Sequence, residues 1–387
     1  MIIINNGVAY RKAHIHIEGG IRMMSSLMKK PVRALILSCA FLLFLAGCSS
    51  NSNNDNSSLS ASPAASASPS ASASASAPAA SSETQYPITI KHAFGETVIE
   101  SKPERVATIA WSNHNVALAL NVVPVGFSAA NYGVIDDSGM LPWTAQKLQE
   151  LGAKDYTIFQ DTAGLDFEAI ANVNPDVILA AYSGITAEEY ATLSKIAPVV
   201  AYPKDPWVIT WRDQVTMNAA GMGMAAEGEQ LIKNIESYIS DISAKYPDLK
   251  GKKIAFASFS AADLSSYYIY TPADPRAGFL LELGMEYPES VLGNVTSESG
   301  FYLQLSAENA DALSGAEALV MYGDQALLDA LQKDPMYSQV PAIKNGAVAL
   351  IGDNTPLAAA ANPDALSLLY TTDEYVSLID AAIKKAQ

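Results

Sequence analysis

The sequence predicts an α/β protein of two similar lobes joined by a single long helix. Three observations lead to this prediction. Short apolar runs alternate with helical patterns from Tyr86 onward, two segments 140 residues apart repeat each other, and a 22-residue helical pattern separates them. Strands that alternate with helices favour a mainly parallel sheet with helices on its faces.

Residues 86–211 are expected to form the first lobe. Short β-rich runs at 88–90 and 97–99 flank Phe94-Gly95 and predict a hairpin. Four further apolar runs are short enough for buried strands, and three segments between them have helical periodicity. We therefore expect strands at 105–110, 123–127, 176–181 and 199–201, with helices at 116–120, 166–173 and 187–196.

Residues 212–250 are expected to connect the lobes. Apolar residues recur at helical spacing from Ala225 to Tyr246, and a helix of 22 residues spans about 33 Å at 1.5 Å per residue. Such a helix bridges two lobes side by side. Because a helix is a stiff hinge, we expect only small closing motions.

Residues 251–387 are expected to form the second lobe. The apolar run 252–257 predicts its first strand, followed by a long loop that carries Tyr267, Tyr268 and Tyr270. The remaining expected elements are helices at 277–283 and 307–312, strands at 318–321 and 347–351, and a C-terminal helix after Asn362-Pro363.

An internal repeat supports the two-lobe organisation. Leu165-Asp-Phe-Glu168 leads through an apolar run to Tyr182, and Leu305-Ser-Ala-Glu308 leads through another to Tyr322, at identical offsets. Both copies predict an N-cap, a short helix, a turn and a strand. Asp166 and Ser306 occupy the expected cap positions.

The first 47 residues have the features of a secretion signal. Lys29, Lys30 and Arg33 precede a 13-residue apolar run, Ala34–Ala46, which is shorter than the roughly 20 residues needed to span a bilayer. The stretch before Met28 fits no signal pattern, so we expect translation to start at Met23, Met24 or Met28, and we make no fold prediction for residues 1–22. The alternative for the apolar run is a short anchor helix.

The apolar run ends in Leu45-Ala46-Gly47-Cys48, which resembles the lipobox of bacterial lipoproteins. The resemblance implies cleavage before Cys48 and diacylation of its thiol. Two acyl chains give stable membrane anchoring. We therefore expect a protein lipid-anchored to the cell membrane on its extracytoplasmic face, with the Ser/Ala/Pro-rich segment 49–85 as a flexible tether.

Charge and composition exclude several classes of function. The chain carries a net charge of −16, and removing residues 1–47 makes it −21, which argues against a nucleic-acid partner. Both cysteines precede residue 49, so the folded part has no disulfide, thiolate zinc site or catalytic thiol. Only His92 and His114 follow the signal, too few for a three-histidine metal site. No Gly-x-Ser-x-Gly segment or Ser/His/Asp set is present, so we expect no catalytic residues, no resident metal and no cofactor.

The ordered set of segments resembles the iron-siderophore and vitamin B12 group of ABC-importer binding lipoproteins. The matching stretches cover essentially all of residues 86–387. They are Ile90–Gly126, Leu165–Leu179, Leu193–Val200 and Lys252–Gly284, the last including Asp274-Pro-Arg276-Ala-Gly. The resemblance implies two Rossmann-like lobes with a helical backbone, the periplasmic binding protein fold. It also implies a monomer that captures a ferric siderophore between its lobes and delivers it to an ABC permease.

Glu168 and Glu308 match the paired acidic residues, one in each lobe, that dock on permease arginines in this family. Each lies in an expected first helical turn, where the helix dipole favours a carboxylate. The alternative is that both residues only stabilise helix starts.

Aromatic and polar residues follow the predicted strands, where ligands bind in open α/β sheets. We take as ligand-binding candidates Trp111, Tyr132, Tyr182, Ser183, Arg212, Tyr268, Arg276 and Tyr322. Aromatic faces with hydroxyl tips suit a bulky, partly apolar chelate. Core packing is the alternative for the aromatic residues, and a salt bridge with Asp274 is the alternative for Arg276.

Three arginines follow the signal, so a trianionic ferric catecholate lacks an obvious cluster of cations. We favour a neutral ferric hydroxamate or a mixed carboxylate chelate. Cobalamin or haem is the alternative ligand. A non-transport surface or sensory lipoprotein is the alternative role.

Overall fold

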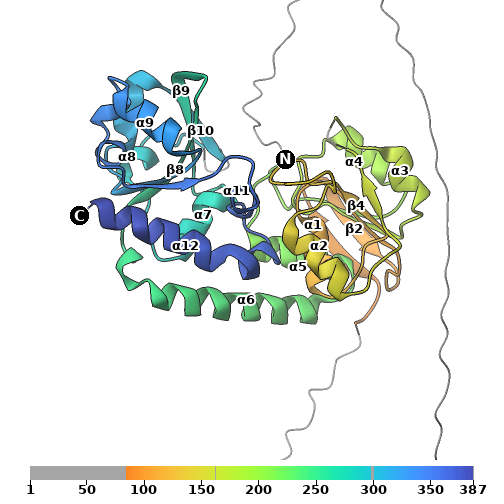
Figure 1. Ribbon diagram of the computed structural model, residues 1–387. Coiled ribbons are helices and arrows are strands. Elements are labelled where there is room, and N and C mark those ends of the chain that lie inside the picture. Colours follow the sequence, from red (N-terminus) through yellow and green to blue (C-terminus); the bar gives the residue numbers. More distant parts are fainter. Residues whose placement is uncertain (1–83, 162, 298–299, 387) are drawn as a thin grey trace, which may run out of the picture. The chain divides into compact units, whose positions relative to one another are not determined.

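The computed structural model describes residues 84–161, 163–297 and 300–386 (Figure 1). The predicted signal, Cys48 and most of the predicted tether lie outside these residues. Within the described part, no helix combines the length and the apolar character needed to cross a membrane.

The first lobe contains a five-stranded sheet in the order β5-β4-β3-β6-β7, and every neighbouring pair is parallel. The predicted parallel sheet is therefore confirmed here. A separate antiparallel hairpin, β1 (Ile88–His92) and β2 (Gly95–Ile99), precedes it as predicted. The sheet strands are β3 (Val106–Thr108), β4 (Gly126–Ser128), β5 (Thr157–Phe159), β6 (Val177–Leu179) and β7 (Val199–Val200).

The second lobe contains a five-stranded sheet in the order β10-β9-β8-β11-β12. β8, β10, β11 and β12 run in one direction, but β9 is antiparallel to both of its neighbours, so this sheet is mixed rather than parallel. Its strands are β8 (Ile254–Ser260), β9 (Asp263–Tyr270), β10 (Tyr302–Ser306), β11 (Ala318–Tyr322) and β12 (Val348–Ile351).

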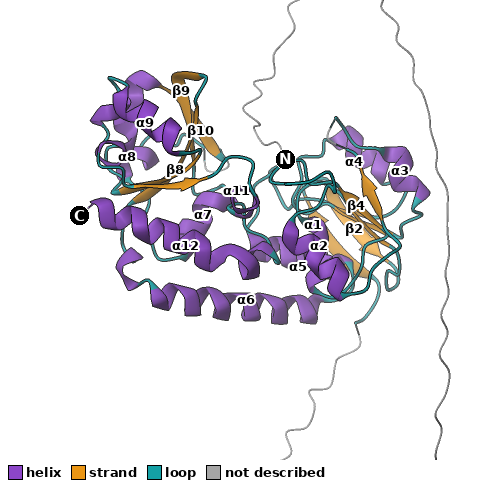
Figure 2. Cartoon of the chain, in the orientation of Figure 1, coloured by secondary structure: helices purple, strands orange, loops and turns teal. Residues whose placement is uncertain are grey.

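Helices cover these sheets and connect them (Figure 2). The predicted long helix is α6, Ala225–Lys245, which packs against α5 and the C-terminal α12. Its apolar stripe, which includes Ile235, Ile239 and Ile242, is buried. The other α-helices are α1 (Asn113–Ala119), α2 (Pro142–Glu150), α3 (Phe167–Asn172), α4 (Ala187–Leu193), α5 (Trp211–Gly221), α7 (Pro275–Glu282), α8 (Glu289–Leu292), α9 (Gln325–Lys333), α10 (Pro341–Lys344), α11 (Pro356–Ala360) and α12 (Ser367–Ala386).

Short 3-10 helices complete the described chain: η1 (Pro247–Leu249), η2 (Ala307–Leu313) and η3 (Tyr337–Gln339). The repeat predicted an α-helix where η2 lies, and its backbone departs from helical geometry at Asn309. Asp166 caps α3 as predicted, because its side chain accepts a hydrogen bond from Ala169 N at 2.9 Å. Ser306 occupies the N-cap position of η2 as predicted, but its hydroxyl makes no capping hydrogen bond to the backbone and accepts from the Asn309 side chain at 3.0 Å.

The predicted tyrosine-bearing loop of the second lobe is wrong as well. Tyr267, Tyr268 and Tyr270 belong to β9, whose side chains alternate between the two faces of the sheet. Tyr267 stacks on Phe259 on one face, and Tyr270 packs against Phe256 and Tyr322 on the other. The sequence also did not predict α2, β5 and α5 before the connecting helix, or α8, β10, α9, α10 and α11 in the second lobe.

Consecutive polar residues at the start of α1 are buried because each has a structural partner. The Asn113 side chain donates to Ile109 O at 2.8 Å and to Tyr182 O at 2.9 Å, tying the ends of two neighbouring strands together. The Asn115 side chain donates a hydrogen bond of 3.0 Å to Asp364, which belongs to the second lobe. His114 stacks on Phe127, and its Nε2 lies 3.3 Å from the Thr144 hydroxyl.

We expect His114 to make the fold sensitive to mild acid. Burial lowers its pKa from 6.5 to about 3, so between these values the unfolded chain binds a proton that the folded chain does not. The free energy of unfolding then falls as pH decreases, by up to about 1.4 kcal/mol per pH unit and by about 2 kcal/mol at pH 5. His114→Phe keeps the stacked ring and should remove this contribution.

Urea unfolding of both proteins at pH 7.5 and pH 5 measures the effect. The Thr144 hydroxyl keeps a hydrogen-bond partner when His114 is replaced, because it donates to Asn115 Oδ1 at 2.8 Å. An equal loss of stability in both proteins between the two pH values would contradict the assignment.

Candidate functional site

A cavity of about 360 Å³ lies at the carboxyl ends of β3, β4 and β6 in the first lobe. Trp111 and Trp207 line it, and Tyr182 packs edge-on against the Trp207 ring with the ring centres 5.2 Å apart. Trp111 is 5% exposed. A cavity at the carboxyl edge of an open α/β sheet is the expected place for a ligand.

The second lobe contributes a buried arginine that interacts electrostatically with Tyr182 of the first lobe. Arg276 is 6% exposed and binds Asp274 through two hydrogen bonds of 2.7 Å, while Asp274 itself is 1% exposed. The guanidinium lies 3.9 Å from the centre of the Tyr270 ring, a cation–π contact. Asp274 also caps α7 by accepting from Arg276 N at 2.9 Å. The proposed Asp274 salt bridge is therefore present, and the arginine is part of an aromatic cluster.

Electrostatics keep this cluster in one protonation state. Burial opposes the charge of Arg276, but Asp274 and the tyrosine hydroxyls outweigh it and hold the arginine's pKa well above its usual value. Burial raises the pKa of Tyr182 and of Tyr322, and the arginine offsets only part of that rise. The phenols thus stay protonated across physiological pH and offer hydroxyl groups rather than negative charge.

Tyrosines of the first lobe contact the second lobe directly. Tyr182 accepts a hydrogen bond from the Asn362 side chain at 2.9 Å, and Tyr132 donates to Asp353 at 2.7 Å. The Tyr132 ring lies edge-on to Tyr322, with 6.1 Å between ring centres. Next to Tyr132, Gly133 has a φ of +77°, and a Cβ there would lie 2.6 Å from the Ala359 Cβ. The close approach of the two lobes at this point therefore requires glycine.

The structure brings together five of the eight ligand-binding candidates near the lobe junction: Trp111, Tyr132, Tyr182, Arg276 and Tyr322. Tyr268 lies further out on the same face of β9 as Tyr270, with its ring against Tyr302. Ser183 is fully buried and donates its hydroxyl to Ala180 O at 2.7 Å, so it stabilises the loop after β6.

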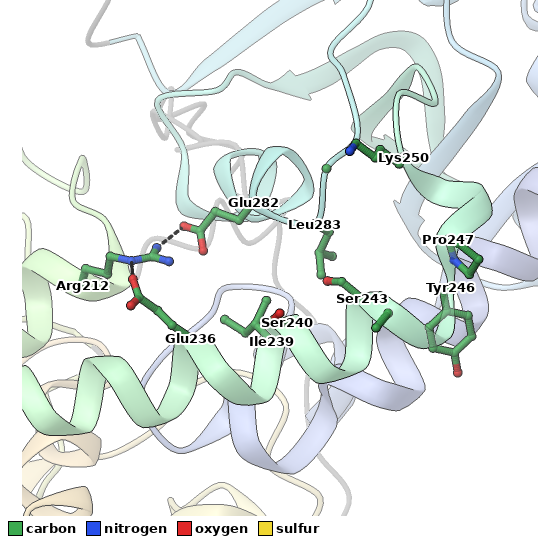
Figure 3. Close-up of a pocket in the computed structure, with 12 residues that line it drawn as sticks. Arg212, Glu236, Ile239, Ser240, Ser243, Tyr246, Pro247, Lys250, Glu282 and Leu283 are labelled. Atoms are coloured by element: carbon green, nitrogen blue, oxygen red, sulfur yellow. Dashed lines mark hydrogen bonds and ion pairs between the residues drawn. The ribbon is translucent and has the colours of Figure 1, made fainter.

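Arg212 lies apart from the aromatic cluster, in a groove of about 570 Å³ between α6 and α7 (Figure 3). Its guanidinium pairs with Glu236 of α6 at 2.6 Å and with Glu282 of α7 at 2.8 Å. The neighbouring Trp211 donates its indole N–H to the same Glu282 at 3.0 Å. Arg212 thus joins α5 to the connecting helix and to the second lobe, which is a structural role.

Glu282→Ala is expected to lower the free energy of unfolding by about 1–2 kcal/mol, since it leaves the buried Trp211 N–H without its acceptor. Glu236→Ala removes only a partly exposed ion pair, so a loss of about 0–1 kcal/mol is expected for this control. Urea unfolding measures both. Equal effects would show that the Trp211 hydrogen bond contributes nothing measurable.

Glu168 and Glu308 are both exposed, near the start of α3 and η2 respectively. Glu308 also lines a shallow pocket of about 210 Å³ with the largely apolar residues Ala307, Ala310, Met336 and Val340. The two carboxylates therefore occupy equivalent, accessible positions in the two lobes, as the repeat predicted.

Sequence reasoning missed three residues of this region. Trp207 is not among the candidates, yet the structure gives it a positive φ of 65° and places its ring against Gly184 in the lining of the cavity. Tyr270 was placed in a loop. Asp161, which also lines the cavity, follows β5, a strand that the sequence did not predict.

Comparison with known proteins identifies the family. The sequence model described as "periplasmic binding protein" matches residues 106–355. The ferric enterobactin-binding periplasmic protein FepB of Escherichia coli O6:H1 is 25% identical over 291 residues, which are 71% of this chain and 87% of that protein.

The crystal structure of Streptococcus pneumoniae PiaA in complex with ferrichrome is 53% identical to this chain. It matches 78% of this chain and all of that chain, with a TM-score of 0.75. Staphylococcus aureus SirA, solved with staphyloferrin B, shares the fold at 23% identity and a TM-score of 0.60, over 75% of this chain and 98% of that chain. This protein belongs to the periplasmic binding protein family.

Proposed function

We propose that this protein captures a ferric hydroxamate siderophore between its two lobes and delivers it to an ABC permease. The observation that carries the proposal is the buried Arg276 with Tyr182, Tyr270 and Tyr322 around it, facing a first lobe whose strand-end cavity is lined by two tryptophans. Aromatic rings with a few fixed polar groups suit a bulky, partly apolar chelate.

The charge of the site supports a ligand whose iron-chelating core is neutral rather than trianionic. Asp274 already balances the charge of Arg276, and the lining of the first-lobe cavity contains no Lys, Arg or His among the described residues. A trianionic ferric catecholate would find no surplus of cations there, whereas three hydroxamates neutralise Fe³⁺ completely. PiaA, the relative at 53% identity, was solved with ferrichrome, a ferric hydroxamate.

Delivery requires contact with a permease, and we assign this contact to Glu168 and Glu308. One exposed carboxylate per lobe suits a partner that presents two cations at matching positions. The apolar pocket beside Glu308 adds a surface that an apolar permease side chain can fill. The lipidated Cys48 and the 49–85 tether would hold a monomeric binding protein near that permease, with the membrane contacted only through the lipid.

Titration of intrinsic Trp and Tyr fluorescence tests the proposal. The ligands are a ferric trihydroxamate, a ferric catecholate, ferric citrate, cobalamin and haem, each iron chelate with its iron-free control. We expect saturable sub-micromolar quenching by the ferric trihydroxamate alone. Saturable quenching by cobalamin or haem would show that the ligand is not a siderophore. The absence of a saturable response to any of these ligands would favour a non-transport role.

A further inference from the structure

The polar lining of the first-lobe cavity is acidic. Asp161 and Glu189 line the cavity together with the polar residues Ser128 and Asn131. At about 360 Å³ the cavity is near the lower end of the roughly 300–1,000 Å³ typical of ligand pockets. It therefore suits one part of a larger chelate, such as a peripheral arm.

Asp161 is a half-buried carboxylate with no counter-charge among the described residues. Its one described side-chain partner is the Ser128 hydroxyl, which donates to Oδ2. The Ser128 oxygen in turn accepts from Ala110 N at 2.8 Å, so the carboxylate is held in one orientation at the end of β5. Burial raises the pKa of Asp161, and the Ser128 hydrogen bond offsets only part of that rise. A cation brought by a ligand would relieve this cost.

Trp111, which also lines the cavity, carries a polar group without a partner in the described part of the chain. Trp111 is more than nine-tenths buried, and its indole N–H has no acceptor among the described residues. Buried N–H groups are usually hydrogen-bonded. A ligand arm with both an acceptor and a cationic donor would serve this N–H and the Asp161 carboxylate, which has a hydrogen-bond donor in Ser128 but no counter-charge among the described residues.

We infer that Asp161 makes the first lobe selective for ferric hydroxamates that carry a primary ammonium group on a peripheral arm, with a carbonyl of the same arm accepting from Trp111. The inference rests on the proposed function and adds a ligand charge to it. Glu189 is less suited than Asp161 to bind the ammonium group. One of its oxygens already accepts from Thr186 N at 2.7 Å in the capping box of α4.

Three ligands with one chelating core test this inference. The linear ferric trihydroxamate ferrioxamine B ends in a primary amine, and acetylation or succinylation of that amine changes the arm charge from +1 to 0 or −1. Affinities of the full chain in detergent for the three ligands are measured by fluorescence titration. We expect the ammonium form to bind about tenfold more tightly than the acetylated form, and the succinylated form to bind most weakly.

The variant Asp161→Asn keeps the shape and an acceptor for Ser128 but removes the charge. It should lower affinity for the ammonium form about tenfold and leave affinity for the acetylated form within about twofold. Asp137→Asn, at an exposed aspartate of the same lobe, is the control for net charge and should preserve the preference. Acetylation also adds bulk to the arm, but any steric penalty from that bulk is the same in the wild type and in Asp161→Asn. A loss of the preference in the variant therefore reports on charge and not on size.

Equal affinities of the wild type for the ammonium and acetylated forms would overturn the inference. So would a preference that survives in Asp161→Asn, or one that Glu189→Gln removes instead. If none of the three ligands binds but ferrichrome does, the inference fails and the proposed function stands. If no ferric hydroxamate binds, the proposed function itself fails.

Discussion

We expect Arg276→Ala to lower the free energy of unfolding by about 3–5 kcal/mol, because it leaves the buried carboxylate of Asp274 without a partner. It should also abolish measurable binding of a ferric trihydroxamate, since the cation–π pair with Tyr270 and the electrostatic contact with Tyr182 are lost together. Urea unfolding and fluorescence titration measure the two effects.

Two further variants separate stability from binding. Asp274→Asn with Arg276→Met removes both charges at once, so most of the lost stability should return while ligand affinity does not. Arg212→Ala is the matched control, because that arginine is a third exposed and pairs at the α6–α7 groove; about 0–1 kcal/mol is expected. Binding restored in the double variant would mean that Arg276 acts on the ligand only through folding.

The second large effect concerns uptake. Glu168→Ala with Glu308→Ala should reduce iron uptake from a radiolabelled ferric hydroxamate by at least about tenfold, while the dissociation constant of the purified protein stays unchanged. The reason is that docking would bury each carboxylate in a hydrogen-bonded pair with a permease cation, and truncating one member of such a buried pair costs about 2–5 kcal/mol. Cells in which the variant replaces the wild-type chain provide the uptake measurement.

Glu188→Ala with Glu289→Ala is the matched control for this experiment. Those residues are also exposed glutamates in first helical turns, one in each lobe. Normal uptake is expected in the control. Equal uptake by both double variants would contradict docking through Glu168 and Glu308, and a lowered ligand affinity in the first would place those residues near the ligand.

The sequence predicted most of the architecture because its strongest patterns are local. Short runs such as Val106–Thr108 and Ala318–Tyr322 favour buried strands by their length and composition, and the buried stripe of α6 repeats at helical spacing. The antiparallel strand β9 escaped prediction because its sequence, Asp-Leu-Ser-Ser-Tyr-Tyr-Ile-Tyr, lacks a clean alternation of apolar and polar residues. Its order comes from pairing with both β8 and β10.

The sequence could predict only those site residues that lie at the carboxyl ends of predicted strands. Trp111, Tyr182 and Tyr322 follow or end their strands, so topology alone places them at the carboxyl edge. Trp207 depends on a left-handed backbone conformation and on the space left by Gly184. Arg212 could not be separated from the site by sequence, since its partners Glu236 and Glu282 are 24 and 70 residues away along the chain.

The position of the iron in a crystal of the complex tests the central claim most directly. Crystals grown with a ferric trihydroxamate would be measured at the iron absorption edge, where an anomalous difference map locates the metal without any assumption about where the ligand lies. We predict one iron peak between the lobes, with Trp111 on one side and Arg276 on the other. A peak elsewhere on the chain, or a complex whose cleft contains no iron, would contradict the proposed capture site.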